Sequence, residues 1–248
     1  MLTKNQEKLI RSLALRKNRK KSGLFVAEGL KLVTDLISAG LAVQNIFLTE
    51  GSSEAFAVTE QTIELSIQEM KSISFLETPS PVLALFEQPV RLSEFQSDTG
   101  LILLLDRIQD PGNMGTLLRS ALWYGVEHIG FVKGCVDAFN PKVVQASMGA
   151  LAHLQCVERS AEEWVEWSAS NGRRLIVADM DGTPAAEMNW TSKDILVLGN
   201  EGQGCDVAFK AVGNKVTLPG NTAKMESLNV AISGATLLYA YATASSEL

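Results

Sequence analysis

Histidine and cysteine are scarce in this sequence, and their arrangement argues against several classes of protein. Two histidines (His128 and His153) and three cysteines occur among 248 residues, and no two cysteines have the CxxC spacing. This set offers neither the ligands of a typical zinc site nor the even cysteine number of a disulfide framework. We therefore expect no metal and a reducing, cytoplasmic location.

A surplus of positive charge and a long uninterrupted apolar run are also missing. The formal net charge is -6 and the isoelectric point is about 5.1, so the bulk charge gives no indication of nucleic-acid binding. No signal peptide is visible, and the apolar stretch over residues 228–244 is interrupted by polar side chains. We expect a buried helix there, and no membrane association. Hydrophobic residues at 46% are enough for one large domain or two modest ones.

The one strong local charge bias lies before residue 22. Eight basic side chains accompany a single acidic one, Glu7, in this segment. It is interpretable as a solvated helix face, as a contact with a phosphate backbone or, less readily, as a mitochondrial transit peptide. The candidate RNA-binding residues are Arg16, Lys17, Arg19, Lys20 and Lys21. Charge reversal at the last four would weaken RNA binding and flatten its salt dependence.

Periodicity predicts a small α/β domain followed by a larger one. In the first ninety residues we expect strands over 24–27, 43–48 and 82–86, and helices over 29–38 and 63–75. The polar, turn-rich stretch EQPVRLSEFQSDTG then predicts a linker, so that the domains are 1–90, a linker 91–100, and 101–248.

Strand and helix signals alternate beyond residue 100. The expected strands are 101–105, 128–132, 151–157, 174–178, 195–198 and 215–218, and the expected helices are 114–124, 141–148, 162–169 and 227–242. Such alternation with nearly continuous apolar strands predicts an α/β fold with a mostly parallel sheet covered on both faces. Ligands of such sheets bind beyond the carboxyl ends of the strands.

The loop after strand 101–105 reads DRIQDPGNMGTLLRSALWYG and carries two candidate site residues. The turn at residues 110–113 presents Asn113 as a possible helix N-cap, and Arg119 follows on the helix. An arginine so close to leucines needs a partner or a function. Pairing with Asp106 or Asp110 is the alternative to a functional role.

The loop LGNEGQG, residues 198–204, follows strand 195–198 and has a carboxylate, Glu201, between glycines. Glycines allow a ligand to approach the backbone closely. The loop lacks both the GxGxxG spacing of a dinucleotide site and the GK[ST] of a phosphate loop, so NAD and ATP are poorly supported.

The loop LPGNTAKMESLNVA, residues 218–231, leads into the last helix. Ser227 is a candidate N-cap of that helix, whereas Asn229 is a polar amide in an otherwise apolar segment and needs a partner. A ligand or a facing loop would supply one.

In this order, NMGTLLR, LGNEGQG and LPGNTAKMESLNVA resemble the three motifs of the SpoU/TrmH family of RNA ribose 2′-O-methyltransferases, within the SPOUT superfamily. The first ninety residues resemble, more weakly, that family's small substrate-binding domain, which is similar to an RNA-binding ribosomal protein. The resemblance implies a deep trefoil knot, a homodimer and S-adenosylmethionine as cofactor.

The same resemblance implies the site residues. The implied catalytic residues are Asn113, Arg119, Glu201, Ser227 and Asn229. The implied cofactor-binding residues are Leu198, Gly199, Asn200, Gly202, Leu218, Pro219, Ser227 and Leu228. Arg119 would act either as the base after strong perturbation of its pKa or as a clamp on phosphate and oxyanion, while Glu201 would orient Arg119 or a neighbouring amide.

The expected reaction is methylation of a ribose 2′-hydroxyl in structured RNA. An added N-terminal domain of this kind favours ribosomal RNA over transfer RNA as the substrate, and an antibiotic-resistance methyltransferase of the same family stays open. The alternatives are an RNA-binding protein of this fold without catalysis, and an ordinary nucleotide-binding enzyme. A rise in melting temperature with NAD or ATP would favour the second.

Overall fold

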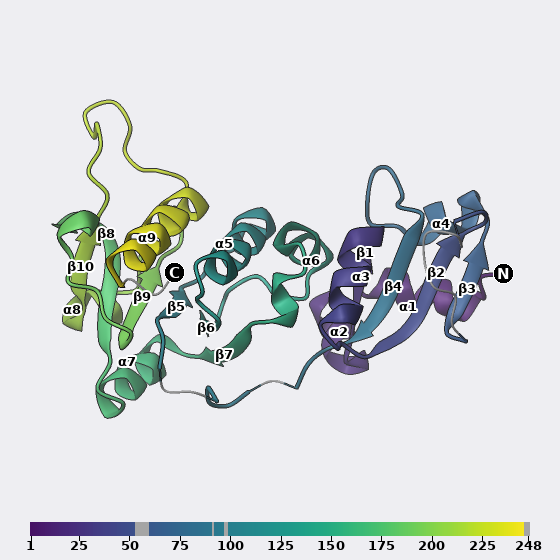
Figure 1. The fold of residues 1–248 in the computed structure, drawn as a ribbon, viewed down its shortest axis with the longest axis horizontal. Helices are drawn as coiled ribbons and strands as arrows, with labels where there is room; N and C mark the ends of the chain where they lie inside the picture. The colour runs from purple at the N-terminus through teal and green to yellow at the C-terminus, as the bar shows by residue number, and fades with distance from the viewer. Residues whose placement is uncertain (53–59, 91, 97–98, 246–248) are drawn as a thin grey trace. The chain divides into compact units, whose positions relative to one another are not determined.

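The computed structural model describes residues 1–52, 60–90, 92–96 and 99–245 (Figure 1). It contains two compact units, the first formed by Met1–Val90 with Asp137–Ala152 and the second by Arg91–Val136 with His153–Leu248. Residues 91, 97 and 98 of the expected linker lie outside the described residues. Leu92 and Phe95 pack against the buried cluster of the second unit.

The first unit has a four-stranded mixed sheet. Its elements are α1 (Lys4–Ser12), α2 (Arg16–Ser22), β1 (Leu24–Glu28), α3 (Leu30–Ser38), β2 (Val43–Thr49), β3 (Thr62–Leu65), α4 (Ile67–Ile73), β4 (Val82–Glu87) and α6 (Pro141–Ser147). The strand order is β1-β4-β2-β3, with β4 antiparallel to both of its neighbours and β3 parallel to β2. An apolar cluster, which includes Ile10, Leu13 and Phe47, joins α1 and α4 to this sheet.

Helix α6 belongs to the first unit although its sequence lies within the stretch expected as the second domain. The helix buries Val143 and Val144 and packs against β1. Burial of these two side chains groups residues 137–152 with the N-terminal sheet, a tertiary effect that chain order does not reveal.

The helix expected over residues 63–75 is wrong in its first part. Residues Thr62–Leu65 form β3, paired in parallel with β2, and the helix α4 starts only at Ile67. Ser66 caps this helix through a capping box with Glu69. The β-branched Thr62 and Ile63 suit a strand, and Ser66 favours a helix start after them.

The second unit is built on a six-stranded sheet. Its elements are β5 (Ile102–Leu105), α5 (Pro111–Trp123), β6 (His128–Val132), β7 (Gln155–Arg159), α7 (Ala161–Ser170), β8 (Arg174–Pro184), a 3₁₀ turn (Ala185–Glu187), β9 (Asp194–Leu198), α8 (Val207–Val212), β10 (Asn214–Thr217) and α9 (Val230–Ser245). The order is β10-β8-β9-β5-β6-β7, and every pair is parallel. The predicted parallel sheet is confirmed.

Several element boundaries differ from the expectation in this unit. The strand expected from Leu151 begins at Gln155, because Ala150–Ala152 form a 3₁₀ turn. The strand from Arg174 continues to Pro184, and α8 was not predicted. Helix α8 is short: its sequence VAFKAV has six residues, too few to show a helical apolar period.

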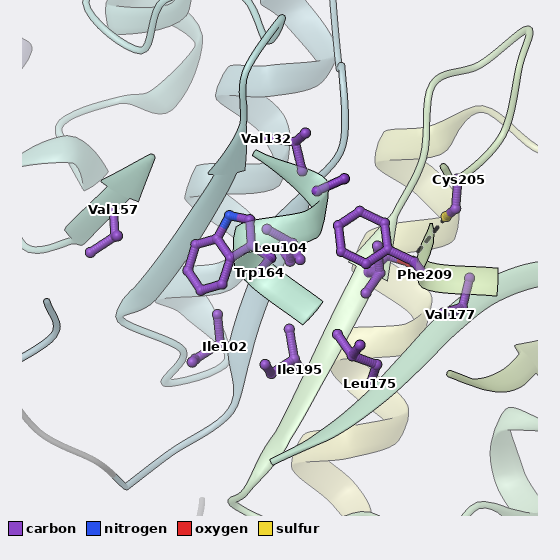
Figure 2. Close-up of a cluster of buried hydrophobic side chains, with 12 residues drawn as sticks. Ile102, Leu104, Val132, Val157, Trp164, Leu175, Val177, Ile195, Cys205 and Phe209 are labelled. Carbon is purple, nitrogen blue, oxygen red and sulfur yellow. Dashed lines mark hydrogen bonds between the residues drawn. The ribbon is translucent and has the colours of Figure 1, made fainter. Parts of the chain in front are cut away.

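The core of the second unit fills the space between its sheet and the helices α7 and α8. Figure 2 shows Trp164 beside Ile102 and Leu104, with Phe209 next to Leu175 and Val177. A larger residue at Gly130 would force its neighbours to shift, because a Cβ at this position would lie 2.7 Å from the side chains of both Leu104 and Trp164. These contacts hold the strands whose ends carry the site.

The chain reverses its direction of travel across the sheet at β5. Strands β6 and β7 follow on one side of β5, while β9, β8 and β10 lie on the other. In open α/β sheets, ligands bind beyond the carboxyl ends of the strands near such a point, so the loops after the paired strands β5 and β9 are expected to contribute to the site.

Candidate active site

A cleft of about 640 Å³ lies beyond the carboxyl ends of β9 and β10 and beside the middle of β8. Three segments line it: residues 178–180 at β8, the glycine loop 198–204, and residues 216–228 with the start of α9. Apolar side chains such as Leu198 and Leu237 alternate there with polar groups. A volume in the range of roughly 300–1,000 Å³ is typical of small-molecule sites.

The glycine loop folds back on itself, and this requires Gly199. A Cβ at residue 199 would lie 2.3 Å from the backbone of both Gly204 and Cys205, far inside contact distance. The Asn200 side chain holds the turn because its Oδ1 accepts hydrogen bonds from the amides of Gly202 and Gln203, at 3.0 and 3.1 Å. The loop is therefore a folded turn that presents Glu201 outward.

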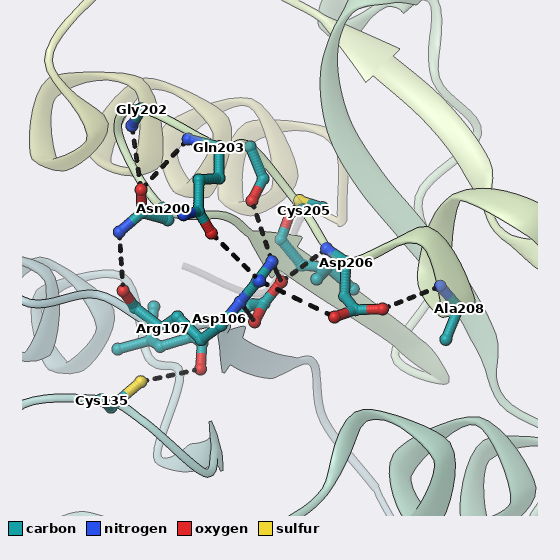
Figure 3. Close-up of polar contacts among 12 residues, drawn as sticks. Asp106, Arg107, Cys135, Asn200, Gly202, Gln203, Cys205, Asp206 and Ala208 are labelled. Atoms are coloured by element: carbon teal, nitrogen blue, oxygen red, sulfur yellow. Dashed lines mark hydrogen bonds and ion pairs between the residues drawn. The ribbon is translucent and has the colours of Figure 1, made fainter.

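A buried carboxylate, Asp106, anchors this loop to the end of β5 (Figure 3). It accepts hydrogen bonds from the Asp206 amide at 2.6 Å and from Arg107 Nε at 2.8 Å. Arg107 has a positive φ of 55°, and its backbone oxygen accepts from Asn200 Nδ2 at 3.0 Å. The hydrogen bond with Asp106 raises the pKa of the Arg107 guanidinium. Arg107 is thus a fixed cation that joins two of the three predicted loops.

Cys205 and Cys135 next to this network are buried thiols. Burial raises the pKa of Cys205 to about 12 and that of Cys135 to about 11. Both are therefore protonated and unreactive at neutral pH.

Three of the predicted catalytic residues are joined by hydrogen bonds. Asn113 Nδ2 donates to Glu201 Oε1 at 2.7 Å, and Asn229 Nδ2 donates to Asn113 Oδ1 at 3.0 Å. We call Glu201, Asn113 and Asn229 the amide relay. It connects the glycine loop, α5 and α9, and it supplies the two partners that the sequence left open: a neighbouring amide for Glu201 and a facing group for Asn229.

The helix caps differ from those expected from the sequence. Helix α5 is capped by Asp110, whose side chain accepts from the Asn113 amide, so Asn113 is not the cap. Helix α9 starts at Val230, and Asn229 Oδ1 accepts from the amides of Ala231 and Ile232. The expectation that Ser227 caps α9 is therefore wrong, since the chain turns into the helix two residues later.

Arg119 and Ser227 stand apart from the amide relay. Arg119 is exposed on α5 and has no hydrogen bond or ion pair with any described residue, so the alternative pairing with Asp106 or Asp110 is not formed. Asp106 is instead paired with Arg107. Ser227 is exposed and lines the cleft.

The residues expected to bind the cofactor all lie on the cleft. Leu198, Gly199, Asn200, Gly202, Leu218, Pro219, Ser227 and Leu228 are among its lining residues. The sequence reasoning missed Asp179, Lys210 and the segment 220–226. The end of the strand expected over 174–178 was the available signal for Asp179, which directly follows it.

One of the predicted RNA-binding residues is engaged inside the first unit. Arg19 is buried on α2, and its guanidinium bonds Asp137 at 2.6 Å and the backbone oxygen of Leu13 at 2.7 Å. This expectation is therefore corrected: with its donors bound to protein, Arg19 is not presented to a phosphate. On the same helix, Lys17, Lys20 and Lys21 are exposed and Arg16 is partly exposed.

Two protein-family models match this chain. The model of the SpoU rRNA methylase family matches residues 100–239, which is more than half of the chain. The chain belongs to the SpoU rRNA methylase family. A second model, the MRM3-like substrate binding domain, matches residues 4–84 of this SpoU-family chain.

Relatives with assigned names agree with the family. The chain is 29% identical to the 23S rRNA guanosine-2′-O-methyltransferase RlmP of Bacillus subtilis, over 95% of this chain and 96% of RlmP. It is 32% identical to the human mitochondrial rRNA methyltransferase 3, over 71% of this chain but 45% of the human protein.

Solved structures of SpoU-type proteins superpose over nearly the whole chain. A TrmH-family protein from Porphyromonas gingivalis matches with a TM-score of 0.86 and 37% identity, covering 97% of this chain and 98% of that one. An AdoMet-bound rRNA methyltransferase from Sinorhizobium meliloti matches with a TM-score of 0.85 and 27% identity, covering 97% and 95%. Within the described part of this SpoU-family chain, no helix combines the length and apolarity needed to cross a membrane.

Proposed function

We propose that this protein transfers the methyl group of S-adenosylmethionine to a ribose 2′-hydroxyl of ribosomal RNA. The observation that carries the proposal is the amide relay, which ends at Glu201 on the wall of the cleft and joins all three motif loops. Family membership and the names of the relatives support the same reaction.

The cleft suits S-adenosylmethionine in size and chemistry. Leu198, Leu218 and Leu228 offer apolar contacts for an adenine, and the backbone of the glycine loop offers polar groups for the sugar. When bound, the cofactor supplies an electrophilic methyl group on a sulfonium. The chain must then bring the 2′-oxygen into line with that methyl and receive its proton.

Different described residues serve these two tasks: some orient the reacting groups, and Arg119 supplies charge. The amide relay orients Glu201 at the cleft, because Asn113 donates to Glu201 and is itself held by Asn229. Arg119, which has no partner among the described residues, is available to RNA. The two roles proposed for it are a clamp on phosphate and oxyanion, and the base that accepts the proton of the 2′-hydroxyl. Ser227 and the cleft-lining residues hold the cofactor.

We also propose a homodimer that forms over the outer faces of α5 and α9. These helices pack side by side (Figure 1), and they expose Trp123, Ile232 and Tyr239, at 79%, 54% and 55%. Arg119 lies one turn before Trp123 on the same exposed stripe. A second protomer seated on this stripe would cover these apolar side chains and approach Arg119.

The remaining proposals rest on the family and the composition. A trefoil knot in the C-terminal part is proposed from membership of the SpoU family. A cytoplasmic location is proposed from the three free cysteines. The domain division at residues 91–100 is proposed from the ends of the two family matches, with α6 transferred to the first unit.

Transfer RNA is the second candidate substrate. The resemblance to SpoU proteins includes tRNA-modifying structures, but these cover only about 60% of this chain and lie at 19–20% identity. The match over residues 4–84 to a substrate-binding domain named after an rRNA methyltransferase favours ribosomal RNA.

The test is methyl transfer from radiolabelled S-adenosylmethionine to bulk ribosomal and transfer RNA, with Arg119→Ala alongside the unaltered protein. We expect label in ribosomal RNA, located at a 2′-oxygen by ribose-methylation-sensitive cleavage, and its loss in the variant. Label in transfer RNA alone would identify the second candidate, transfer RNA, as the substrate. Cofactor binding without label in any RNA, including assembled ribosomal subunits, would favour an RNA-binding protein without catalysis.

A further inference from the structure

Three charged side chains meet at the edge of the cleft, outside the family motifs. The Asp179 carboxylate lies 3.4 Å from Lys210 Nζ and 3.5 Å from Lys215 Nζ. Asp179 follows the buried part of β8, Lys210 lies on α8 and Lys215 on β10. Asp179 and Lys210 line the cleft, whereas Lys215 is not among its lining residues. We call these three residues the charged trio.

The charges of the trio do not cancel. One carboxylate faces two ammonium groups, which leaves one positive charge. Burial would raise the pKa of Asp179, but the Met180 amide and the charges of both lysines outweigh it and lower this pKa, so the carboxylate is ionised. Because Lys215 already neutralises Asp179 from outside the cleft, the charge of Lys210 has no full counterpart.

The position of Lys210 directs this charge toward the glycine loop. A Cβ on Gly204 would lie 3.3 Å from Lys210 Nζ, tighter than an ordinary contact. Glycine at this position, where φ is +68°, leaves the ammonium uncovered on the loop side. An ammonium has three donors, and the contact with Asp179 uses only part of them. The trio is thus a held cation with free donors at the wall of the cleft.

We propose that Lys210 binds the α-carboxylate of the cofactor's amino-acid end, with Asp179 as a positioning residue that holds Lys210 in place. This inference rests on the proposed function, since it takes S-adenosylmethionine as the occupant of the cleft. The α-carboxylate is the cofactor's anionic group, and Lys210 is the cation of the cleft that a second charged residue fixes. Lys224, the other lysine on the wall, lies in an exposed loop with no ion pair to a described residue.

The test compares two ligands that differ at the amino-acid end. Calorimetry on the full chain measures binding of S-adenosylhomocysteine, which carries the carboxylate, and of 5′-methylthioadenosine, which lacks it. We expect Lys210→Met to weaken binding of the first ligand roughly 10- to 100-fold, the range for a lost charged hydrogen bond, and to leave the second unchanged. Lys210→Arg should restore most of the binding because it restores the cation.

Lys133→Met is the matched control. It removes another lysine that is ion-paired with a carboxylate, Glu163 at 3.2 Å, and that is not among the cleft-lining residues. We expect it to change binding of either ligand less than threefold. Melting temperatures of all variants show that each one is folded.

The other outcomes overturn the inference in distinguishable ways. Equal weakening of both ligands would mean that Lys210 shapes the nucleoside pocket instead. If Lys210→Met left binding of S-adenosylhomocysteine unchanged but made RNA binding weaker and less salt-dependent, the anion bound by Lys210 would be an RNA phosphate. In both cases the proposed function stands. If the unaltered chain bound neither ligand, the proposed function would fall together with this inference.

Discussion

At the scale of single residues, the amide relay shows how short polar side chains set the geometry of the site. Asn113 donates to Glu201 and accepts from Asn229, so one amide on α5 connects two loops that lie far apart in the sequence. Asn229 has a second task, because its Oδ1 also caps α9. A change at Asn113 therefore alters orientation at the cleft without opening a helix end.

Replacement of Asn113 by alanine tests this orienting role. We expect kcat to fall about 100-fold, because misplacement of the reacting groups costs about that much, and the cofactor Kd to change less than threefold. Glu201→Gln should retain activity within tenfold, since a glutamine oxygen still accepts from Asn113. Single-turnover methylation and calorimetry measure the two effects.

Thr116→Ala is the control on the exposed face of α5, one turn after Asn113. Unchanged kcat in Asn113→Ala would remove the relay from the mechanism. Loss of activity in Glu201→Gln as large as in Asn113→Ala would show that the charge of Glu201, beyond its hydrogen bond, is needed.

At the scale of elements, the tightly folded backbone of the glycine loop restricts which side chains fit at its positions. Gly199 lies against the backbone of Gly204 and Cys205, whereas a Cβ on Gly202 would meet only Asn200 Oδ1, at 3.7 Å. Glycine is therefore needed at these two positions of one motif for different physical reasons. Gly199 serves the fold of the loop, and Gly202 leaves space at the cleft.

The pair Gly199→Ala and Gly202→Ala separates these reasons. We expect the first substitution to lower the free energy of unfolding by about 1–3 kcal/mol or more, because backbone atoms cannot move aside as a side chain can. Gly202→Ala should change it by less than about 0.5 kcal/mol. Urea unfolding followed by circular dichroism measures both, and similar values for the two variants would contradict the folded-back loop.

At the scale of the whole molecule, each of the two units carries one part of the proposed task. The first unit bears the exposed lysines of α2, and the second bears the cleft and the amide relay. The net charge of -6 makes the basic side chains of α2 a local exception on an acidic protein. RNA binding is therefore expected to depend on a small number of positions.

Charge reversal at Lys17, Lys20 and Lys21 tests the contribution of α2. We expect weaker RNA binding and a slope of log K against log salt that is shallower by about one for each lysine changed. Reversal of the exposed Lys31, Lys71 and Lys193 is the control with an equal change in net charge. An unchanged slope in the first variant would exclude α2 from the RNA contact.

The proposed dimer is tested on the stripe over α5 and α9. We expect Trp123→Asp with Tyr239→Asp to give a monomer in sedimentation velocity, because two carboxylates would have to be buried at the interface. Val207→Asp with Val212→Asp is the control, since these side chains on α8 are as exposed, at 79% and 62%. A dimer that survives the first pair, or a monomer from the unaltered chain, would refute this interface.

The sequence by itself determined the fold class, the order of the three loops and, through the resemblance of its motifs, part of the lining of the cleft. Nearly continuous apolar strands alternating with helices indicate a parallel sheet, and the glycines and polar residues at the strand ends identify the loops. Such signals can be recognised in the sequence because hydrophobic periodicity and turn formation depend on neighbouring residues alone.

Only the tertiary structure decided which groups meet. It paired Asn113 with Glu201 and Asn229, withdrew Arg19 into an ion pair with Asp137, and brought α6 to the N-terminal sheet. It also brought Asp179, Lys210 and Lys215 together from three separate elements. Contacts between residues tens of positions apart depend on strand order and on how side chains pack, and neither is encoded in a local pattern.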